Sequence, residues 1–189
     1  YPIFEESVLY KQLDFQWSPA KLAYEGINHY EYMLDGKREK IIGSQFGEYL
    51  HGLYVILYPF TIMSWESAKI AWFILNFFLI IYIPFLICTK YNLGSSETLI
   101  IIFFFISANV TKAHMVIGQQ TIFVLFFMCL PFVSSSRISI IFSGIAYFKY
   151  SISYVLFFYF IIKKNYKFLL YSLIIPILGW LIYSYITNT

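Results

Sequence analysis

The residues best suited to chemistry lie in a short polar stretch, Lys112–Gln120, between two strongly apolar runs. The stretch contains a lysine, a histidine and two glutamines, among them Lys112, His114 and Gln119. The interior of a lipid bilayer gives bare amide groups no hydrogen-bonding partner. Irregular polar backbone at that depth must therefore lie within protein, in a cavity or at the membrane surface. The stretch is either an ordinary turn at the membrane surface or the wall of a site.

Carboxylates are confined to the first part of the chain. The sequence has 10 Asp and Glu residues, and none of them follows Glu97. A reaction that uses a carboxylate as base or nucleophile must therefore take it from before that residue. Asp14 is the first candidate, because partial burial beside Phe15 and Trp17 would raise its pKa toward a range useful for a general base. The alternative is a solvated aspartate in a loop.

Composition predicts the broad class of the protein. The chain is 60% hydrophobic, 23% aromatic and 12% charged, whereas about a quarter of the residues in a soluble domain are charged. We therefore expect an all-α polytopic membrane protein. Trp65, Trp72 and Tyr82 are expected as anchors at the membrane interface. Cys88 and Cys129 both stand in apolar runs, which favours packing over a disulfide or a metal pair.

Charge also limits the partners. The net charge of +3 is small, and its scattered distribution gives no support for nucleic-acid binding. His29 and His51, with Glu25 or Glu48, invite a metal interpretation. These ligands are dispersed and lack a compact spacing, so we expect no metal site. Membrane lipids are the expected surroundings.

The chain divides into two regions. Residues 1–47 are mixed and polar and are expected to form an extracytoplasmic loop region, followed by a transmembrane helical domain over residues 48–189. Within the first region, Ser18-Pro19 indicates the start of a helix that Gly26 ends. The chain opens in a polar stretch at Tyr1, and we expect it to be part of a longer chain.

Several apolar segments predict membrane helices. His51–Met63 is shorter than the roughly 20 residues that a span needs, and it favours an interfacial or re-entrant helix. Ala68–Thr89 is long enough to cross a membrane, and Pro84 is a possible kink within it. The further segments are Thr98–Ala108, Gln119–Val133 and Phe168–Tyr185.

The segment Ile138–Ile162 can be interpreted in two ways. As one span it puts Lys149 near the middle of the bilayer, at a cost of about 3 kcal/mol. As two shorter segments, Ile138–Phe148 and Ser151–Ile162, it places Lys149 at a turn. The basic residues favour the second interpretation, because it puts Lys90, Arg137 and the lysines at 163, 164 and 167 on one side, as the positive-inside rule requires. Asp14, the polar stretch and Lys149 then all lie on the non-cytoplasmic side.

The order of these features resembles a known enzyme family. Asp14-Phe15 is similar to the Asp-Phe motif in the first extracytoplasmic loop of the multi-spanning, lipid-linked-sugar glycosyltransferases of the GT-C fold, glycosyltransferase family 87 above all. Gly26 to Tyr30 resembles the Gly-x-x-x-Tyr element that follows. Asn109 with Gly118-Gln119 resembles the Asn…Gly-Gln element, and Gly144…Lys149 the Gly…Lys-Pro element, with Tyr150 in place of the proline.

The resemblance implies a fold and an activity. The fold would be a GT-C-like bundle of transmembrane and re-entrant helices in a multi-pass protein of the cell membrane. The activity would be inverting transfer of a hexose, mannose in this family, from a polyprenyl-phosphate donor to a lipid or glycan acceptor, on the non-cytoplasmic face. Asp14 would be the catalytic base, and Lys149, Gln119 and His114 would bind the donor phosphate or sugar. No cofactor besides the donor substrate is implied.

A non-enzymatic protein is the alternative. A membrane transporter would be expected to show repeat symmetry, or polar residues at corresponding mid-span positions of two halves. The sequence shows neither pattern. A lipid-handling subunit is the other protein of this class. The carboxylate-bearing N-terminal region followed by short apolar segments favours the transferase.

Overall fold

The computed structural model describes residues 16–42 and 49–189. Asp14, the predicted catalytic base, lies outside these ranges. Every regular element in the described ranges is a helix, and no strand occurs in them. Two of the described helical segments, Trp65–Lys90 and Tyr166–Thr187, are long and apolar enough to cross a membrane, and a bent helix pair makes a third candidate. The all-helical class and the presence of candidate membrane spans, both predicted from composition, are confirmed.

The N-terminal region forms two short helices. Helix α1 (Trp17–Tyr24) carries Pro19 in its first turn, where a missing amide hydrogen costs nothing. Gly26 follows it with φ +76°, a left-handed conformation that glycine adopts without strain. Helix α2 (His29–Leu34) is capped by Asn28, whose side chain accepts a hydrogen bond from the amide of Tyr30 at 3.1 Å. The predicted helix start and end are both confirmed.

The next apolar segment is broken. The sequence predicted one interfacial or re-entrant helix over His51–Met63, but the structure has two helices, α3 (Gly52–Ile56) and α4 (Tyr58–Thr61). Pro59 stands in the first turn of α4. A proline in the interior of a continuous helix would remove a backbone hydrogen bond and clash with the preceding turn. Splitting the segment just before the proline avoids both costs.

Helix α5 (Trp65–Lys90) is the longest element. Ser64 caps it by accepting a hydrogen bond from the amide of Ser67. Helix α6 (Ser95–Ser107) packs back along α5, and helix α7 (Asn109–Ile117) follows after a bend of 56°. Most of the polar stretch Lys112–Gln120 is therefore helical. This helix was not predicted. Both interpretations of the stretch, a turn at the membrane surface and the wall of a site, assumed irregular backbone.

The chain breaks where Lys149 was expected to mark a turn. Helix α8 (Thr121–Val133) is followed by α9 (Arg137–Ser143), the 3-10 helix η2 (Gly144–Phe148) and α10 (Tyr150–Ile162). Lys149 alone separates η2 from α10, with φ −106° and ψ 79°. The interpretation as two shorter segments is confirmed. The last candidate span consists of α11 (Tyr166–Ser172) and α12 (Ile174–Thr187).

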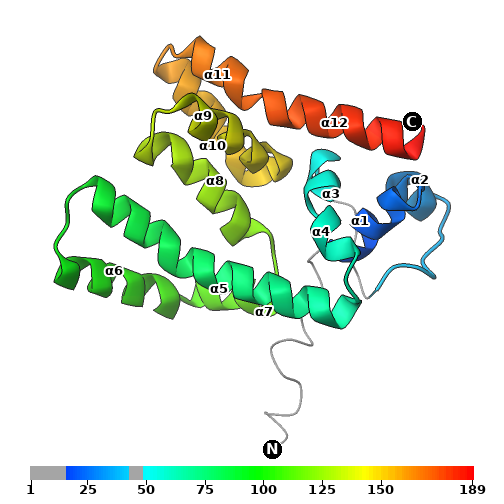
Figure 1. Cartoon of the computed structure of the whole chain (residues 1–189), viewed down its shortest axis with the longest axis horizontal. Helices are drawn as coiled ribbons and strands as arrows, with labels where there is room; N and C mark the ends of the chain where they lie inside the picture. The colour runs from blue at the N-terminus through cyan, green and yellow to red at the C-terminus, as the bar shows by residue number, and fades with distance from the viewer. Residues whose placement is uncertain (1–15, 43–48) are drawn as a thin grey trace, which may run out of the picture.

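The helices place the basic residues at Lys90, Arg137 and positions 163–167 at the end opposite the N-terminal helices (Figure 1). The C-terminal end of α5, the start of α9 and the connection between α10 and α11 lie on the left of the view, and helices α1 to α4 lie on the right. Lys90, Arg137 and Lys163 belong to the left-hand group. This arrangement is the one that the positive-inside argument needs. Which end faces the cytoplasm stays a prediction.

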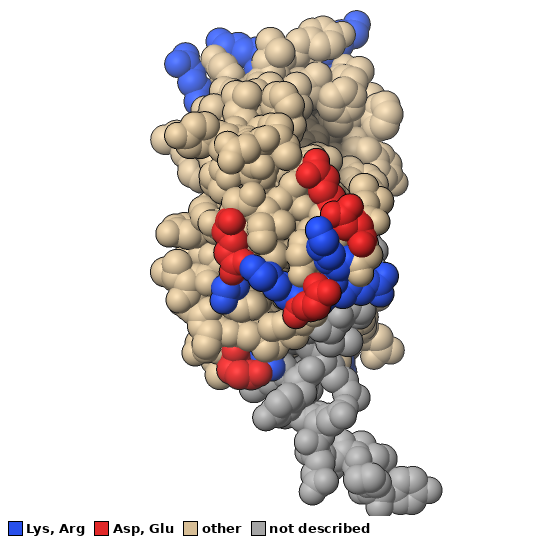
Figure 2. Space-filling model, turned by 90° about the vertical axis from the view of Figure 1, so that its right-hand side faces the viewer, with Lys and Arg blue, Asp and Glu red and all other residues tan. Residues whose placement is uncertain are grey.

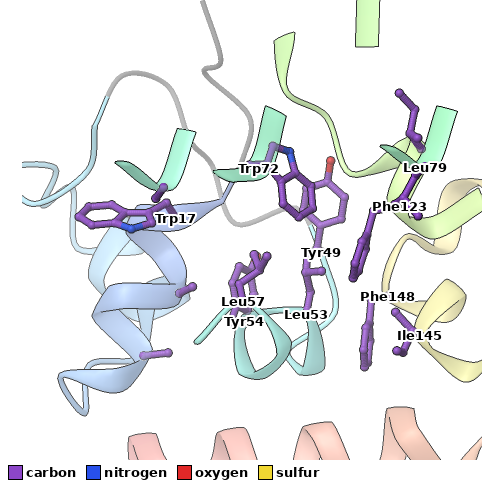
Figure 3. Close-up of a cluster of buried hydrophobic side chains, with 14 of the residues drawn as sticks. Trp17, Tyr49, Leu53, Tyr54, Leu57, Trp72, Leu79, Phe123, Ile145 and Phe148 are labelled. Carbon is purple, nitrogen blue, oxygen red and sulfur yellow. The ribbon is translucent and has the colours of Figure 1, made fainter. Parts of the chain in front are cut away.

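One core joins the N-terminal helices to the membrane helices. Trp17 of α1, Leu53 of α3, Trp72 of α5 and Phe148 of η2 all belong to it, and Figure 3 shows their side chains converging from these elements. Trp72 is completely buried. The prediction that Trp72 anchors the membrane interface is therefore wrong: its indole packs inside the protein and donates a hydrogen bond there.

Candidate functional site

Lys149 is held at a junction of three segments. Its ammonium donates hydrogen bonds to the hydroxyl of Thr121 at 3.0 Å and to the hydroxyl of Tyr49 at 3.3 Å. It also lies 5.2 Å from the centroid of the Tyr49 ring, within cation–π range. The adjacent backbone is pinned as well, since the amide of Leu50 donates to the carbonyl of Phe148 at 3.1 Å. The lysine head is therefore surrounded by hydroxyl groups from distant parts of the chain.

The link between α7 and α8 forms the neighbouring wall. Gly118 ends α7 with φ +75°, a conformation that favours glycine. The indole of Trp72 donates to the Gly118 carbonyl at 2.8 Å, which fixes this link against α5. The Thr121 hydroxyl lies 3.4 Å from the side-chain oxygen of Gln119. Thr121 therefore connects the Gln119 side chain to the Lys149 ammonium.

His114 completes the group from the last turn of α7. Its ring lies near enough to interact with the Lys149 charge and with the Gln119 side chain. Its Nδ1 atom is buried and has no hydrogen-bond partner within the described part of the chain. Lys112, two residues earlier, is exposed. The structure therefore brings together Lys149, Gln119 and His114, the three residues predicted to bind the donor, and leaves Lys112 outside.

The arrangement suits an anionic oxygen compound. An ammonium group gives charge-assisted hydrogen bonds, which are about twice as strong as neutral ones. The hydroxyls of Thr121 and Tyr49 can each donate once they rotate away from neighbouring acceptors. Gln119 adds an amide that both donates and accepts. A cation with two hydroxyls and an amide can recognise a phosphate and an adjacent sugar hydroxyl.

The contacts of two members of this group with Lys149 were not predicted from the sequence. Thr121 stands just after the polar stretch, at the start of an apolar run, and its closeness to Gln119 was an available signal. Tyr49 lies 100 positions before Lys149. It is one of the aromatic residues whose rings could stack on a sugar, but nothing in the local sequence predicts that its hydroxyl contacts Lys149. Only the fold brings its hydroxyl to the lysine.

A second polar cluster lies between α2 and α12. The ring of His29 is completely buried, and its Nδ1 lies 2.9 Å from the hydroxyl of Tyr183. That hydroxyl also donates to the Asn28 side-chain oxygen at 3.3 Å. Burial, with a smaller effect of nearby His51, lowers the pKa of His29 to about 3. His29 is thus neutral and links α2 to α12.

No model of a protein family, no curated protein and no solved structure matches this chain. The class of the protein therefore rests on the fold itself. Over the described ranges it is an all-helical chain with two, or up to three, helices able to cross a membrane. It carries an internal polar group centred on Lys149.

Proposed function

We propose that the protein is an integral-membrane glycosyltransferase that moves a hexose from a polyprenyl-phosphate donor to a lipid or glycan acceptor. The observation that carries the proposal is the convergence on Lys149 of Thr121, Gln119 and His114. Lys149 is partly buried, and a lysine charge among apolar helices is costly unless it has partners or a ligand. A donor phosphate that arrives with its polyprenyl tail in lipid would meet a cation and hydroxyl donors here.

The proposed reaction needs one more group. In an inverting transfer, the acceptor hydroxyl attacks the anomeric carbon, the bond from that carbon to the phosphate oxygen breaks, and a base takes the hydroxyl proton. The leaving lipid phosphate gains negative charge, which the Lys149 ammonium would stabilise. Asp14 is the proposed base, on the resemblance of its Asp-Phe motif and on the lack of carboxylates after Glu97.

The proposal is tested by a transfer assay with the full chain in membranes. Radiolabelled polyprenyl-phosphate mannose is incubated with these membranes and a lipid acceptor fraction, and the same donor with glucose is run in parallel. The proposal expects label to move to the acceptor in proportion to the amount of protein. Membranes that lack the chain set the background. Absence of transfer from every polyprenyl-phosphate sugar tried would rule out the enzyme.

A further inference from the structure

A cavity beside α1 is separate from the Lys149 site. It has a volume of about 280 Å³ and is lined by Trp17, Ser18, Lys21, Leu22, Glu25 and Lys40. Binding sites for drug-sized molecules occupy roughly 300–1,000 Å³, so this cavity has the size for a smaller polar group. Its lining residues belong to α1 and to Glu25 just after it, except for Lys40, which follows α2.

The charges of the cavity favour an anion. Lys40 is paired with Glu25 at 2.7 Å. Lys21 has no carboxylate partner among the described residues, and its ammonium lies 4.7 Å from the centroid of the Trp17 ring. The lining thus holds two lysines against one glutamate, with one lysine balanced only by an aromatic face. A ligand with negative charge would supply the partner that Lys21 lacks.

The position of the cavity identifies the source of that anion. Trp17 packs at 5.6 Å against Trp65, the first residue of the membrane helix α5. Trp65 is only partly buried, and tryptophan side chains gather at the level of lipid headgroups, so Trp65 marks this end of the apolar helix. Figure 2 shows Lys, Arg, Asp and Glu side chains gathered on the end of the molecule where the N-terminal helices lie. The cavity therefore lies where the apolar span meets a charged, water-facing surface.

We propose that the α1 cavity binds the phosphate of an anionic lipid headgroup, with Lys21 as its main contact. Lys40 is a second and weaker contact, because it is already paired with Glu25. This inference does not depend on the proposed glycosyl transfer, since a structural lipid would use the same site. The shared chemistry is a phosphate ester, and a free sugar phosphate or glycerol phosphate is the competing source.

The test measures binding of short-chain phosphatidylglycerol to the detergent-solubilised full chain by calorimetry, with short-chain phosphatidylcholine as the uncharged comparison. Saturable binding of phosphatidylglycerol is expected, at least tenfold tighter than that of phosphatidylcholine. Lys21→Gln should weaken it about tenfold, as expected for loss of a charge-assisted hydrogen bond. Glu25→Gln should strengthen it severalfold, because that change releases Lys40 and removes a negative charge.

The matched control is Lys37→Gln. Lys37 is an exposed lysine paired with Asp35 at 2.9 Å, outside the cavity lining, and its replacement should leave the affinity unchanged. Equal losses in Lys21→Gln and Lys37→Gln would overturn the site in favour of general surface charge. Equally tight phosphatidylcholine binding would overturn the anion requirement. Displacement by glycerol 3-phosphate at concentrations similar to the lipid would overturn the lipid source.

Discussion

The ammonium of Lys149 donates a hydrogen bond to the hydroxyl of Thr121 across 3.0 Å. This contact joins the break before α10 to the first residue of α8. Both residues lie where a helix begins, and a helix end leaves backbone groups without partners within the helix. Polar side chains or a bound anion can supply partners for these backbone groups. The proposed donor site is therefore built from helix ends.

We predict that Asp14 is the general base. Asp14→Asn keeps the shape of the side chain but cannot accept a proton, so turnover should fall by about two to four orders of magnitude. Binding of the polyprenyl-phosphate donor should stay close to wild type. The measurement is the initial rate of mannose transfer by the full chain in membranes. Glu31→Gln, at an exposed position of α2, should keep most activity, and a fully active Asp14→Asn protein would exclude this role.

Part of the fold was predictable because the chain is so apolar. Ala68–Thr89 lies within α5, and the break at Lys149 was predicted from the positions of the basic residues under the positive-inside rule. The burial of Trp72 was not predictable, since an indole suits both a membrane interface and a core. His29 stands in a polar segment, for which the sequence predicts exposure to water. Its burial depends on Tyr183, 154 positions away.

The candidate site was predictable to a similar extent. His114 and Gln119 belong to one polar stretch, so they were expected near each other, and family resemblance added Lys149. The helical course of Asn109–Ile117 was not expected, because polar residues between apolar runs usually mark a turn. The bend of 56° after α6 places this helix beside α5, and the contact between Trp72 and Gly118 fixes the end of it.

We predict that acid destabilises the protein through His29. The pKa of His29 is lowered to about 3 in the folded protein, against about 6.5 in the unfolded chain. The unfolded chain therefore binds the proton first as the pH falls, and stability is lost progressively between pH 6.5 and pH 3. The free energy of unfolding should drop by about 2 kcal/mol between pH 7 and pH 5.

The measurement is the midpoint of thermal unfolding in detergent as a function of pH. His29→Asn keeps a side chain that can hydrogen-bond to Tyr183 but cannot titrate. It should lower stability at pH 7 through lost packing, and it should flatten the dependence between pH 7 and pH 5. An unchanged slope in His29→Asn would assign the acid sensitivity to another group, such as His51.

The contact between α3 and α12 should be sensitive to a single methyl group. A Cβ atom added at Gly179 would lie 2.7 Å from the Cα atom of Gly52, which is backbone and must shift. Gly179→Ala should therefore destabilise the protein by about 1–3 kcal/mol, seen as a lower midpoint of thermal unfolding. At Gly94 the added atom meets only the flexible side chain of Glu97. If Gly94→Ala costs as much as Gly179→Ala, close backbone packing is not the cause.

We predict that the two ends of the molecule lie on opposite sides of the membrane. Lys163 belongs to the basic group and Lys37 to the N-terminal region, and both are exposed. In a background without Cys88 and Cys129, Lys163→Cys should react with an impermeant reagent only from the cytoplasmic side. Lys37→Cys should react only from the opposite side. Labelling of both positions from one side would refute the predicted topology.

The central claim is that the group around Lys149 binds the phosphate of a polyprenyl-phosphate sugar. Lys149→Met removes the charge and keeps the length of the side chain, Lys149→Arg keeps the charge, and Lys112→Met removes an exposed lysine from the same polar region as the control. Thermal unfolding in detergent checks that each variant is folded.

The deciding measurement is the apparent affinity of each folded variant for radiolabelled polyprenyl-phosphate mannose. A charge-assisted hydrogen bond is worth about 1.5–3 kcal/mol, so Lys149→Met should weaken binding more than tenfold. Lys149→Arg should retain part of the affinity, and Lys112→Met should match wild type. If folded Lys149→Met binds the donor as tightly as wild type, Lys149 is a structural residue and the donor site lies elsewhere.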